Sequence, residues 1–249
     1  MSEPMIDLVF LPGLLSDDQV WRHQINALKQ SYSVQVIPLT EFSSPQKMVE
    51  HVLKVAPKEF VLFGHSLGGW VALEVAKSAP ERIKGLGLLN TTARPESQEN
   101  KVWHELLIKK ANEESFESVI SNLLPIYLTP IDLGDPKLHD ELLNMFLRMG
   151  KETFIRQQTA IINRPGNLND LAHIKCPTLI IHASNDVLVS SEMQEEMLNK
   201  IPNSNIEIIR ECGHFSMLEK PEDVTKMTKQ WLDEKFLAKK LQEQSQHLE

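Results

Sequence analysis

The chain has 249 residues, 41% of them hydrophobic and 24% charged, which is typical of a folded globular protein with a sizeable core. Its formal net charge of −8 argues against nucleic acid or an anionic membrane as a partner, because an acidic surface does not attract polyanions. The N-terminus lacks the basic start of a signal peptide, no apolar run approaches the length of a membrane span, and there are only two cysteines, so we expect a cytoplasmic protein with free thiols.

The first part of the chain alternates short apolar runs with stretches in which apolar residues recur at helical spacing. Apolar runs bounded by turn residues indicate buried strands, whereas recurrence every three or four residues indicates an amphipathic helix. These patterns predict strands over 5–11, 33–39, 58–63 and 83–89, and helices over 17–29 and 45–55.

The third strand runs into Gly64-His65-Ser66-Leu67-Gly68, and helical spacing begins directly afterwards. A G-x-S-x-G pattern between a strand and a helix is typical of a nucleophile elbow, a tight turn that strains a serine and exposes its hydroxyl. Ser66 is therefore our candidate nucleophile. The plainer alternative is a glycine-rich turn between a core strand and a core helix. A phosphate-binding loop fits less well, because no lysine follows Gly69.

From residue 91 to residue 173, charged residues, leucines and methionines recur at helical spacing. We expect several helices that form a cap, inserted into an α/β core of residues 1–90 and 174–249. The underside of such a cap would roof the pocket above Ser66, and large apolar side chains suit a pocket for a small molecule. The substrate-binding candidates on this roof are Trp103, Tyr127, Met145 and Phe146. The alternative is that such residues pack the cap helices against one another.

The alternation then returns, with strands predicted over 176–183 and 205–210 and helices over 190–200 and 221–235. Strands that alternate with helices form βαβ units, so the predicted fold class is α/β with a mostly parallel, doubly wound sheet. Such sheets bind their ligands at the carboxyl ends of the strands. The partners of Ser66 are therefore expected at the ends of other strands.

A serine hydroxyl is a weak nucleophile that needs an adjacent base, and the base needs a carboxylate to orient it. His214 follows the last predicted strand in a glycine-bearing loop, and Asp186 follows the strand before it. The chain order Ser66, Asp186, His214 is the one expected for a G-x-S-x-G scaffold. Taken singly, His214 could be an ordinary surface-loop histidine, and Asp186 could be an ordinary turn aspartate. Asn90, at the end of another strand, cannot supply the negative charge.

The carbonyl oxygen of an attacked ester develops negative charge, which backbone N–H groups can stabilise. One donor is expected from Leu67, directly after the nucleophile, and the other from Leu14 in the loop after the first strand. An ordinary strand-to-helix turn is the alternative for that loop. His65 adjoins the serine, but its side chain must leave the turn in another direction, so we expect it to pack behind the corner.

These motifs together resemble the α/β-hydrolase superfamily, in particular small cytosolic bacterial hydrolases with a helical cap. The resemblance covers nearly the whole chain and rests on the segments LPGLL, FGHSLGGW, CPTLIIHASND and CGHFSMLEKPE. It implies a catalytic triad of Ser66, Asp186 and His214, with no metal or cofactor. Many members have a histidine where this chain has Pro12. That difference is expected to affect packing more than mechanism, because the donor in this loop is a backbone N–H.

These residues favour serine-dependent hydrolysis of a small, largely apolar carboxylic ester, with a thioester or a lactone as variants. The runner-up is a lyase or synthase that uses the triad for acid–base chemistry. Members resembling the menaquinone-pathway synthase carry an arginine after the elbow glycines, where this chain has Trp70. Pimeloyl-carrier-protein methyl esterases are closer, and Arg148, Lys151 and Arg156 form the cluster that would dock an acidic carrier.

A binding protein that has abandoned turnover is the third class of function. Such a protein has little reason to keep a strained corner together with a serine, an aspartate and a histidine in this order. The sequence leaves the oligomeric state open.

Overall fold

A six-stranded sheet forms the centre of the computed structural model, which describes residues 6–237. Neighbouring strands all run parallel, in the order β2-β1-β3-β4-β5-β6. The strands are β1 (Asp7–Leu11), β2 (Ser33–Val36), β3 (Phe60–His65), β4 (Ile83–Leu89), β5 (Thr178–Ala183) and β6 (Ser204–Ile209). The predicted α/β class with a parallel sheet is confirmed.

The strand order reverses between β1 and β3. β2 lies on one side of β1, whereas β3 lies on the other side and the later strands continue outward from it. The connections on the two sides of this point diverge, which leaves a crevice at the carboxyl ends of the strands. β3 ends at this crevice, and all six of its residues are buried, as expected for a central strand covered on both faces.

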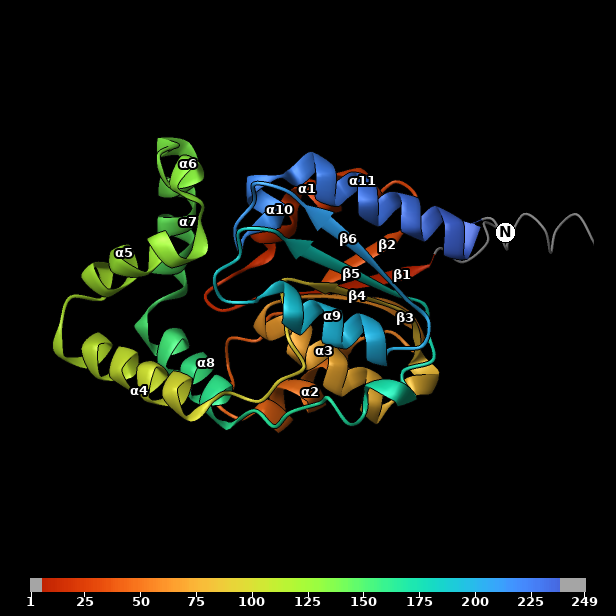
Figure 1. The fold of residues 1–249 in the computed structure, drawn as a ribbon, viewed down its shortest axis with the longest axis horizontal. Helices are drawn as coiled ribbons and strands as arrows, with labels where there is room; N and C mark the ends of the chain where they lie inside the picture. Colours follow the sequence, from red (N-terminus) through yellow and green to blue (C-terminus); the bar gives the residue numbers. More distant parts are fainter. Residues whose placement is uncertain (1–5, 238–249) are drawn as a thin grey trace, which may run out of the picture.

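Helices cover both faces of the sheet (Figure 1). They are α1 (Arg22–Leu28) and α11 (Pro221–Leu232) on one face, and α2 (Pro45–Val55), α3 (Leu67–Ser78) and α9 (Ser191–Lys200) on the other. Each face has its own apolar core. Phe10, Phe63 and Trp231 meet in the core on the α11 side, and Trp70 packs in the core on the α3 side.

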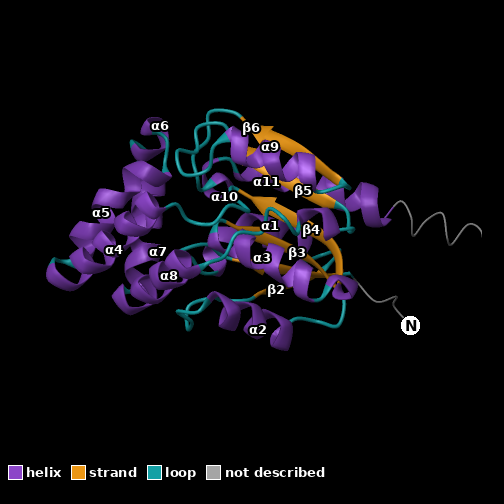
Figure 2. Cartoon of the chain, turned by 60° about the horizontal axis from the view of Figure 1, so that its bottom comes forward, coloured by secondary structure: helices purple, strands orange, loops and turns teal. Residues whose placement is uncertain are grey.

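Five helices between β4 and β5 lie beyond the carboxyl ends of the strands, on the side toward which β5 and β6 point (Figure 1, Figure 2). They are α4 (Gln98–Glu113), α5 (Phe116–Tyr127), α6 (Pro130–Leu133), α7 (Pro136–Met149) and α8 (Lys151–Asn163). α4 packs against α8, so the first and last long helices meet at the root of this cap. The division into a core of 1–90 and 174–249 and a cap of 91–173 stays a prediction, and 1–5 and 238–249 lie outside the described residues.

Two elements near the N-terminus differ in detail from the prediction. The segment after residue 17 begins as a 3₁₀ turn over Asp18–Trp21, at whose start the Asp17 carboxylate accepts a hydrogen bond from the Gln19 N–H at 3.0 Å. β2 ends before residue 39 because Pro38 has no N–H with which to continue the ladder.

Cys176 and Cys212 are both free thiols. Within residues 6–237, no helix combines the length and the apolar character needed to cross a membrane.

Candidate active site

The corner between β3 and α3 holds Ser66 in a strained conformation. Its φ of 53° and ψ of −117° lie in a region that side-chain-bearing residues rarely adopt. The two glycines around it permit the close contacts that the turn requires. A Cβ on Gly64 would lie 2.3 Å from the Gly68 carbonyl oxygen, and one on Gly68 would lie 2.3 Å from the Leu11 carbonyl oxygen. Both contacts are far shorter than van der Waals distance, so the corner admits only glycine at these positions.

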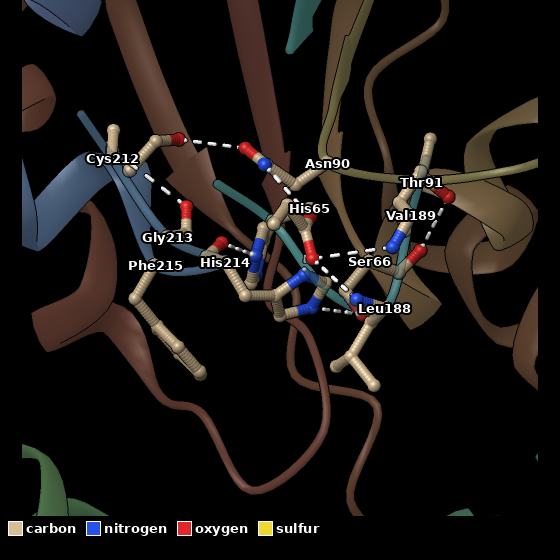
Figure 3. Close-up of polar contacts among 12 residues, drawn as sticks. His65, Ser66, Asn90, Thr91, Leu188, Val189, Cys212, Gly213, His214 and Phe215 are labelled. Atoms are coloured by element: carbon tan, nitrogen blue, oxygen red, sulfur yellow. Dashed lines mark hydrogen bonds and ion pairs between the residues drawn. The ribbon is translucent and has the colours of Figure 1, made fainter. Parts of the chain in front are cut away.

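A continuous chain of hydrogen bonds joins three strand ends (Figure 3). The Ser66 Oγ lies 2.9 Å from Nε2 of His214, which follows β6, and the His214 Nδ1 lies 2.8 Å from Oδ2 of Asp186, which follows β5. An ionised carboxylate only accepts, so Nδ1–H donates to Asp186 and Nε2 is left to accept the serine proton. This arrangement can deprotonate a nucleophilic hydroxyl.

Asp186 is buried and receives several hydrogen bonds. Its Oδ1 accepts from the backbone N–H groups of Leu188 at 2.9 Å and Val189 at 3.2 Å, while its Oδ2 accepts from His214 and from Asn90. Burial opposes ionisation, but the His214 ring and these hydrogen bonds outweigh it, and the pKa of Asp186 lies below its ordinary value. The carboxylate is therefore charged and fixed in orientation.

Asn90 is a positioning residue that the sequence reasoning missed. It follows β4 with a φ of 47° and is fully buried. Its Nδ2 donates to Asp186 Oδ2 at 2.9 Å, while its Oδ1 accepts from the Ser216 hydroxyl at 2.8 Å. The Ser216 hydroxyl thereby fixes which end of the amide faces the carboxylate. Its uncharged side chain cannot act as the acid, but an amide at a strand end can serve the acid as a hydrogen-bond donor.

His65 is buried at the corner, where it belongs to the residues that line the cavity and also contacts the histidine loop. Its Nε2 lies 2.9 Å from the His214 carbonyl oxygen, so this nitrogen carries the proton that is donated. Burial and the neighbouring His214 lower the pKa of His65 to about 3, so its ring is neutral. The ring therefore acts as a fixed hydrogen-bond donor to the loop.

Glu219 connects both sides of the histidine loop. Its Oε2 accepts from the Gly213 N–H at 2.8 Å and its Oε1 accepts from the Phe215 N–H at 2.9 Å, on either side of His214. The same carboxyl receives the N–H of Thr129, next to the cap helix α6, at 3.4 Å. A glutamate among the apolar residues of the segment after His214 was the available signal for this role, and it was not used.

The predicted oxyanion donors both belong to residues that line the cavity. Leu67 is the first residue of α3, where a backbone N–H has no helical carbonyl to bond. Leu14 lies in the loop after β1, and the next residue is fixed to the cap by a 2.8 Å hydrogen bond from the Leu15 N–H to the Gln157 Oε1. The role of Leu14 and Leu67 as donors stays a prediction.

A cavity of about 270 Å³ lies between the strand ends and the cap. Ser66 and His214 open into it. Its apolar lining residues are Leu14, Leu67, Trp103, Tyr127, Ile161, Leu188, Val189 and Phe215. A second set, which we call the polar cluster, consists of Glu96, Asn100, His104 and Arg164. The sequence analysis did not find the polar cluster, because nothing in its spacing distinguishes it from a solvated helix face.

The four cap residues expected to bind substrate separate into two pairs. Trp103 and Tyr127 line the cavity. Met145 and Phe146 are not among its described lining residues, and this part of the prediction is corrected: both are buried in the interior of the cap. The Phe146 ring lies 5.6 Å from those of Tyr127 and Phe215, behind the wall that they form. Helical spacing shows which residues of α7 share a face, but not which neighbour that face meets.

Similar proteins are found by sequence and by structure. A family profile described as the alpha/beta hydrolase family matches residues 8–226. The pimeloyl-[acyl-carrier protein] methyl ester esterase of Nitrosospira multiformis is 27% identical over 237 residues, which cover 87% of this chain and 90% of that protein.

Two solved structures superpose closely. A thermophilic esterase from Thermogutta terrifontis gives a TM-score of 0.84 at 24% identity, covering 93% of this chain and 91% of that one. The enol-lactonase of Burkholderia xenovorans LB400 gives 0.82 at 21% identity, covering 92% and 91%. At these identities the likeness establishes the fold.

Proposed function

The chain belongs to the alpha/beta hydrolase family, and on that premise we propose that it is a serine hydrolase that cleaves a carboxylic ester with Ser66, His214 and Asp186. The observation that carries the proposal is the unbroken path from the Ser66 hydroxyl through His214 to Asp186, with distances of 2.9 Å and 2.8 Å. The path starts at a strained serine on the wall of a cavity of small-molecule size.

In the first half of the reaction, the Ser66 Oγ attacks the ester carbonyl carbon while its proton passes to the His214 Nε2. The carbonyl oxygen becomes an oxyanion, for which the N–H groups of Leu14 and Leu67 are the proposed donors. His214 then gives the proton to the leaving alkoxide, the C–O bond breaks, and the alcohol departs. The acyl group remains on Ser66.

In the second half, a water molecule takes the place of the alcohol. His214 removes a proton from the water as its oxygen attacks the acyl carbonyl, and returns that proton to the Ser66 Oγ as the acid leaves. Asp186 stabilises the imidazolium at both stages and keeps Nδ1 protonated, and Asn90 holds Asp186 in place. The same steps serve a thioester or a lactone.

The apolar lining suits a substrate with an apolar body, since eight apolar residues border the cavity. A pimeloyl ester on a carrier protein, the substrate in the name of the Nitrosospira relative, is less well supported. Of the basic residues expected to dock such a carrier, Arg148 pairs with Asp17 at 2.6 Å and Arg156 donates to the Thr40 carbonyl at 2.8 Å. We therefore propose a free small-molecule ester.

The proposal is tested with a fluorophosphonate probe and with p-nitrophenyl acetate. The wild type is expected to be labelled and to hydrolyse the ester, whereas Ser66→Ala does neither and retains its unfolding midpoint. The matched control is Ser31→Ala, at an exposed serine before β2 on the opposite edge of the strands, which should behave as the wild type. Labelling or near-wild-type hydrolysis by Ser66→Ala contradicts the proposal. Labelling without hydrolysis of any ester would favour a lyase or a binding protein on the same scaffold.

A further inference from the structure

The polar cluster occupies part of the cavity wall but has no role in the proposed mechanism. Glu96 and Arg164 form an ion pair in which an Arg164 Nη2–H donates to Glu96 Oε1, and their side chains are only 7% and 10% exposed. The Asn100 Nδ2 donates to Glu96 Oε2 at 3.0 Å, and the His104 Nε2 lies 3.9 Å from that oxygen. Taking two charges out of water is costly, so this pair calls for an explanation.

Closing the root of the cap does not explain the pair. Glu96 precedes α4 and Arg164 follows α8, so the pair spans the entry and the exit of the cap. Two other hydrogen bonds already fix these segments: the Trp70 Nε1–H donates to the Pro165 carbonyl at 3.0 Å, and the Asn167 N–H donates to the Ala93 carbonyl at 2.7 Å. The backbone around the cluster is therefore held without the charged side chains.

The cluster presents hydrogen-bonding groups that protein atoms do not satisfy. The His104 Nδ1–H donates to the Gln158 Oε1 at 2.5 Å. Burial lowers the pKa of His104, so its ring is neutral and its Nε2 carries a lone pair that points to the carboxylate region. The Arg164 Nε–H has no partner among residues 6–237 but is closed to a water-sized molecule, so a ligand in the cavity would meet the Nη N–H groups, of which Nη2 donates to Glu96. Acceptors and a donor thus stand side by side, and leaving such buried groups unpaired costs free energy.

The charges of the cluster select against an ionic ligand. Glu96 and Arg164 cancel, so a substrate carboxylate or ammonium would be attracted by one of them and repelled by the other. Such an ion would lose its hydration without a net gain in attraction, which is costly in a site shielded from water. An uncharged group that both donates and accepts avoids this penalty. Hydroxyl and carboxamide groups have this property.

We infer that the polar cluster binds an uncharged hydroxyl or carboxamide group of the ester substrate. The group donates to Glu96 or to the His104 Nε2 and accepts from Arg164. This inference rests on the proposed hydrolysis and names its substrate class: an ester with an apolar body and one neutral, hydrogen-bonding end. It departs from a wholly apolar substrate, which would cover the cluster without pairing it.

Two series of esters of one chain length test the inference. One consists of methyl esters whose acyl chain ends in methyl, carboxamide, carboxylate or ammonium, and the other of acetate esters whose alcohols end in methyl, hydroxyl, carboxylate or ammonium. Hydrolysis is followed by titration of released acid. In at least one series, the wild type is expected to show a kcat/KM for the neutral polar end about 10- to 100-fold above that for the other ends.

The variant Glu96→Met/Arg164→Met replaces the pair by apolar side chains of similar size and should remove this preference, chiefly through KM. Glu96→Gln, which keeps the shape of the side chain, is the second variant and should reduce it. The matched control is Arg94→Met/Glu196→Met, because this 2.7 Å ion pair lies near the cap root and outside the described lining of the cavity. It should keep the wild-type preference.

The outcomes separate this inference from the proposed function. Hydrolysis of p-nitrophenyl acetate without any preference for a neutral polar end overturns the inference alone. A preference for a charged end overturns it as well, and so does an equal loss on every ester in both cluster variants, which marks a structural role. If the wild type hydrolyses no ester, the proposed function fails and the inference fails with it.

Discussion

The two walls of the cavity differ in how completely the side chains that carry charge are hydrogen-bonded. On the wall formed by the strand ends, Asp186 accepts four hydrogen bonds and His214 is bonded at both ring nitrogens. On the wall formed by the cap, the Arg164 guanidinium makes one hydrogen bond within residues 6–237, from Nη2 to Glu96. A group that performs chemistry must be held in one geometry before the substrate arrives. A group that recognises a substrate must keep some hydrogen-bonding atoms free for the substrate.

The walls also differ in what holds them. Ser66 directly follows β3, and Asp186 and His214 lie in the loops that leave β5 and β6, three and five residues past the strand ends; the parallel ladders fix the places of those ends. The cap residues depend on how five helices pack on one another. From this comparison we expect the reaction at the strand ends and its selectivity from the cap, and each prediction below tests one side of that division.

The largest effect is expected at Asp186. Asp186→Asn keeps the shape of the side chain but removes the charge and allows an amide N–H to face His214, which favours the wrong tautomer of the ring. We expect kcat to fall by about 10³- to 10⁴-fold with the fold retained, measured with p-nitrophenyl acetate and by circular dichroism. The matched control is Asp135→Asn at the N-cap of α7, where asparagine and aspartate cap a helix equally well, so the same change should have little effect. A variant at Asp186 with most of its activity would place the chemistry elsewhere.

The next effect separates packing from recognition within the cap. Phe146 is 1% exposed and contacts two other rings, so Phe146→Ala should lower the free energy of unfolding by about 3–5 kcal/mol. Trp103 is only partly buried and lines the cavity, so Trp103→Ala should cost less stability and instead raise KM for esters with apolar chains. Urea unfolding and steady-state kinetics on both variants give the comparison. If Phe146→Ala and Trp103→Ala have equal effects on stability and on KM, packing and recognition are not separated within the cap.

The fold was predictable because its signals are local and repeated. Each strand is a short apolar run followed by a turn, and the G-x-S-x-G corner fixes one strand-to-helix junction without knowledge of the rest. The details that differed depend on single bonds. Pro38 shortens β2 because it lacks an N–H, a limit that the proline itself indicates and the apolar pattern alone does not.

The site was predictable only on one wall. The loop that leaves a strand end is placed by the sheet, so the positions of Asp186 and His214 predicted that they would meet Ser66, and the structure brings the three side chains together. Glu96 and Arg164 lie 68 positions apart and meet only because α4 packs on α8. Met145 was misplaced for the same reason, since the spacing of apolar residues identifies a buried face but not what covers it. Long-range packing is the information that the sequence pattern lacked.

Glu219 joins the two walls, and its titration gives a pH-dependent test of that link. Burial, with a contribution from nearby Asp132, raises the pKa of Glu219 from an ordinary value of 4.5 to about 8. The folded state therefore keeps a proton that the unfolded state has lost, and the free energy of unfolding falls as pH rises between these two values. The slope for a single group is at most about 1.4 kcal/mol per pH unit.

Glu219→Gln, whose neutral amide resembles the protonated carboxyl, should remove this slope. Urea unfolding at intervals between pH 5 and pH 8 measures it. The matched control is Glu222→Gln, at an exposed carboxylate in the first turn of α11, which should leave the slope as it is. If the Glu219 variant keeps the full decline in stability, another buried group is responsible and the link between the histidine loop and the cap does not titrate in this range.

The smallest effect is expected at Asn90, and it tests whether the strand-end wall needs its outer hydrogen bonds. Asn90→Gly tolerates the positive φ and removes the donor to Asp186, so the carboxylate can turn and kcat should fall by about tenfold. Ser216→Ala leaves the Asn90 amide free to rotate and should cost less. If the Ser216 hydroxyl acts only through Asn90, the double variant will be no slower than Asn90→Gly alone. If the losses in kcat from the two single changes add up in the double variant, Ser216 supports the site independently of Asn90. The geometry of the strand-end wall would then not depend on the single hydrogen-bonded path from Ser216 through Asn90 to Asp186.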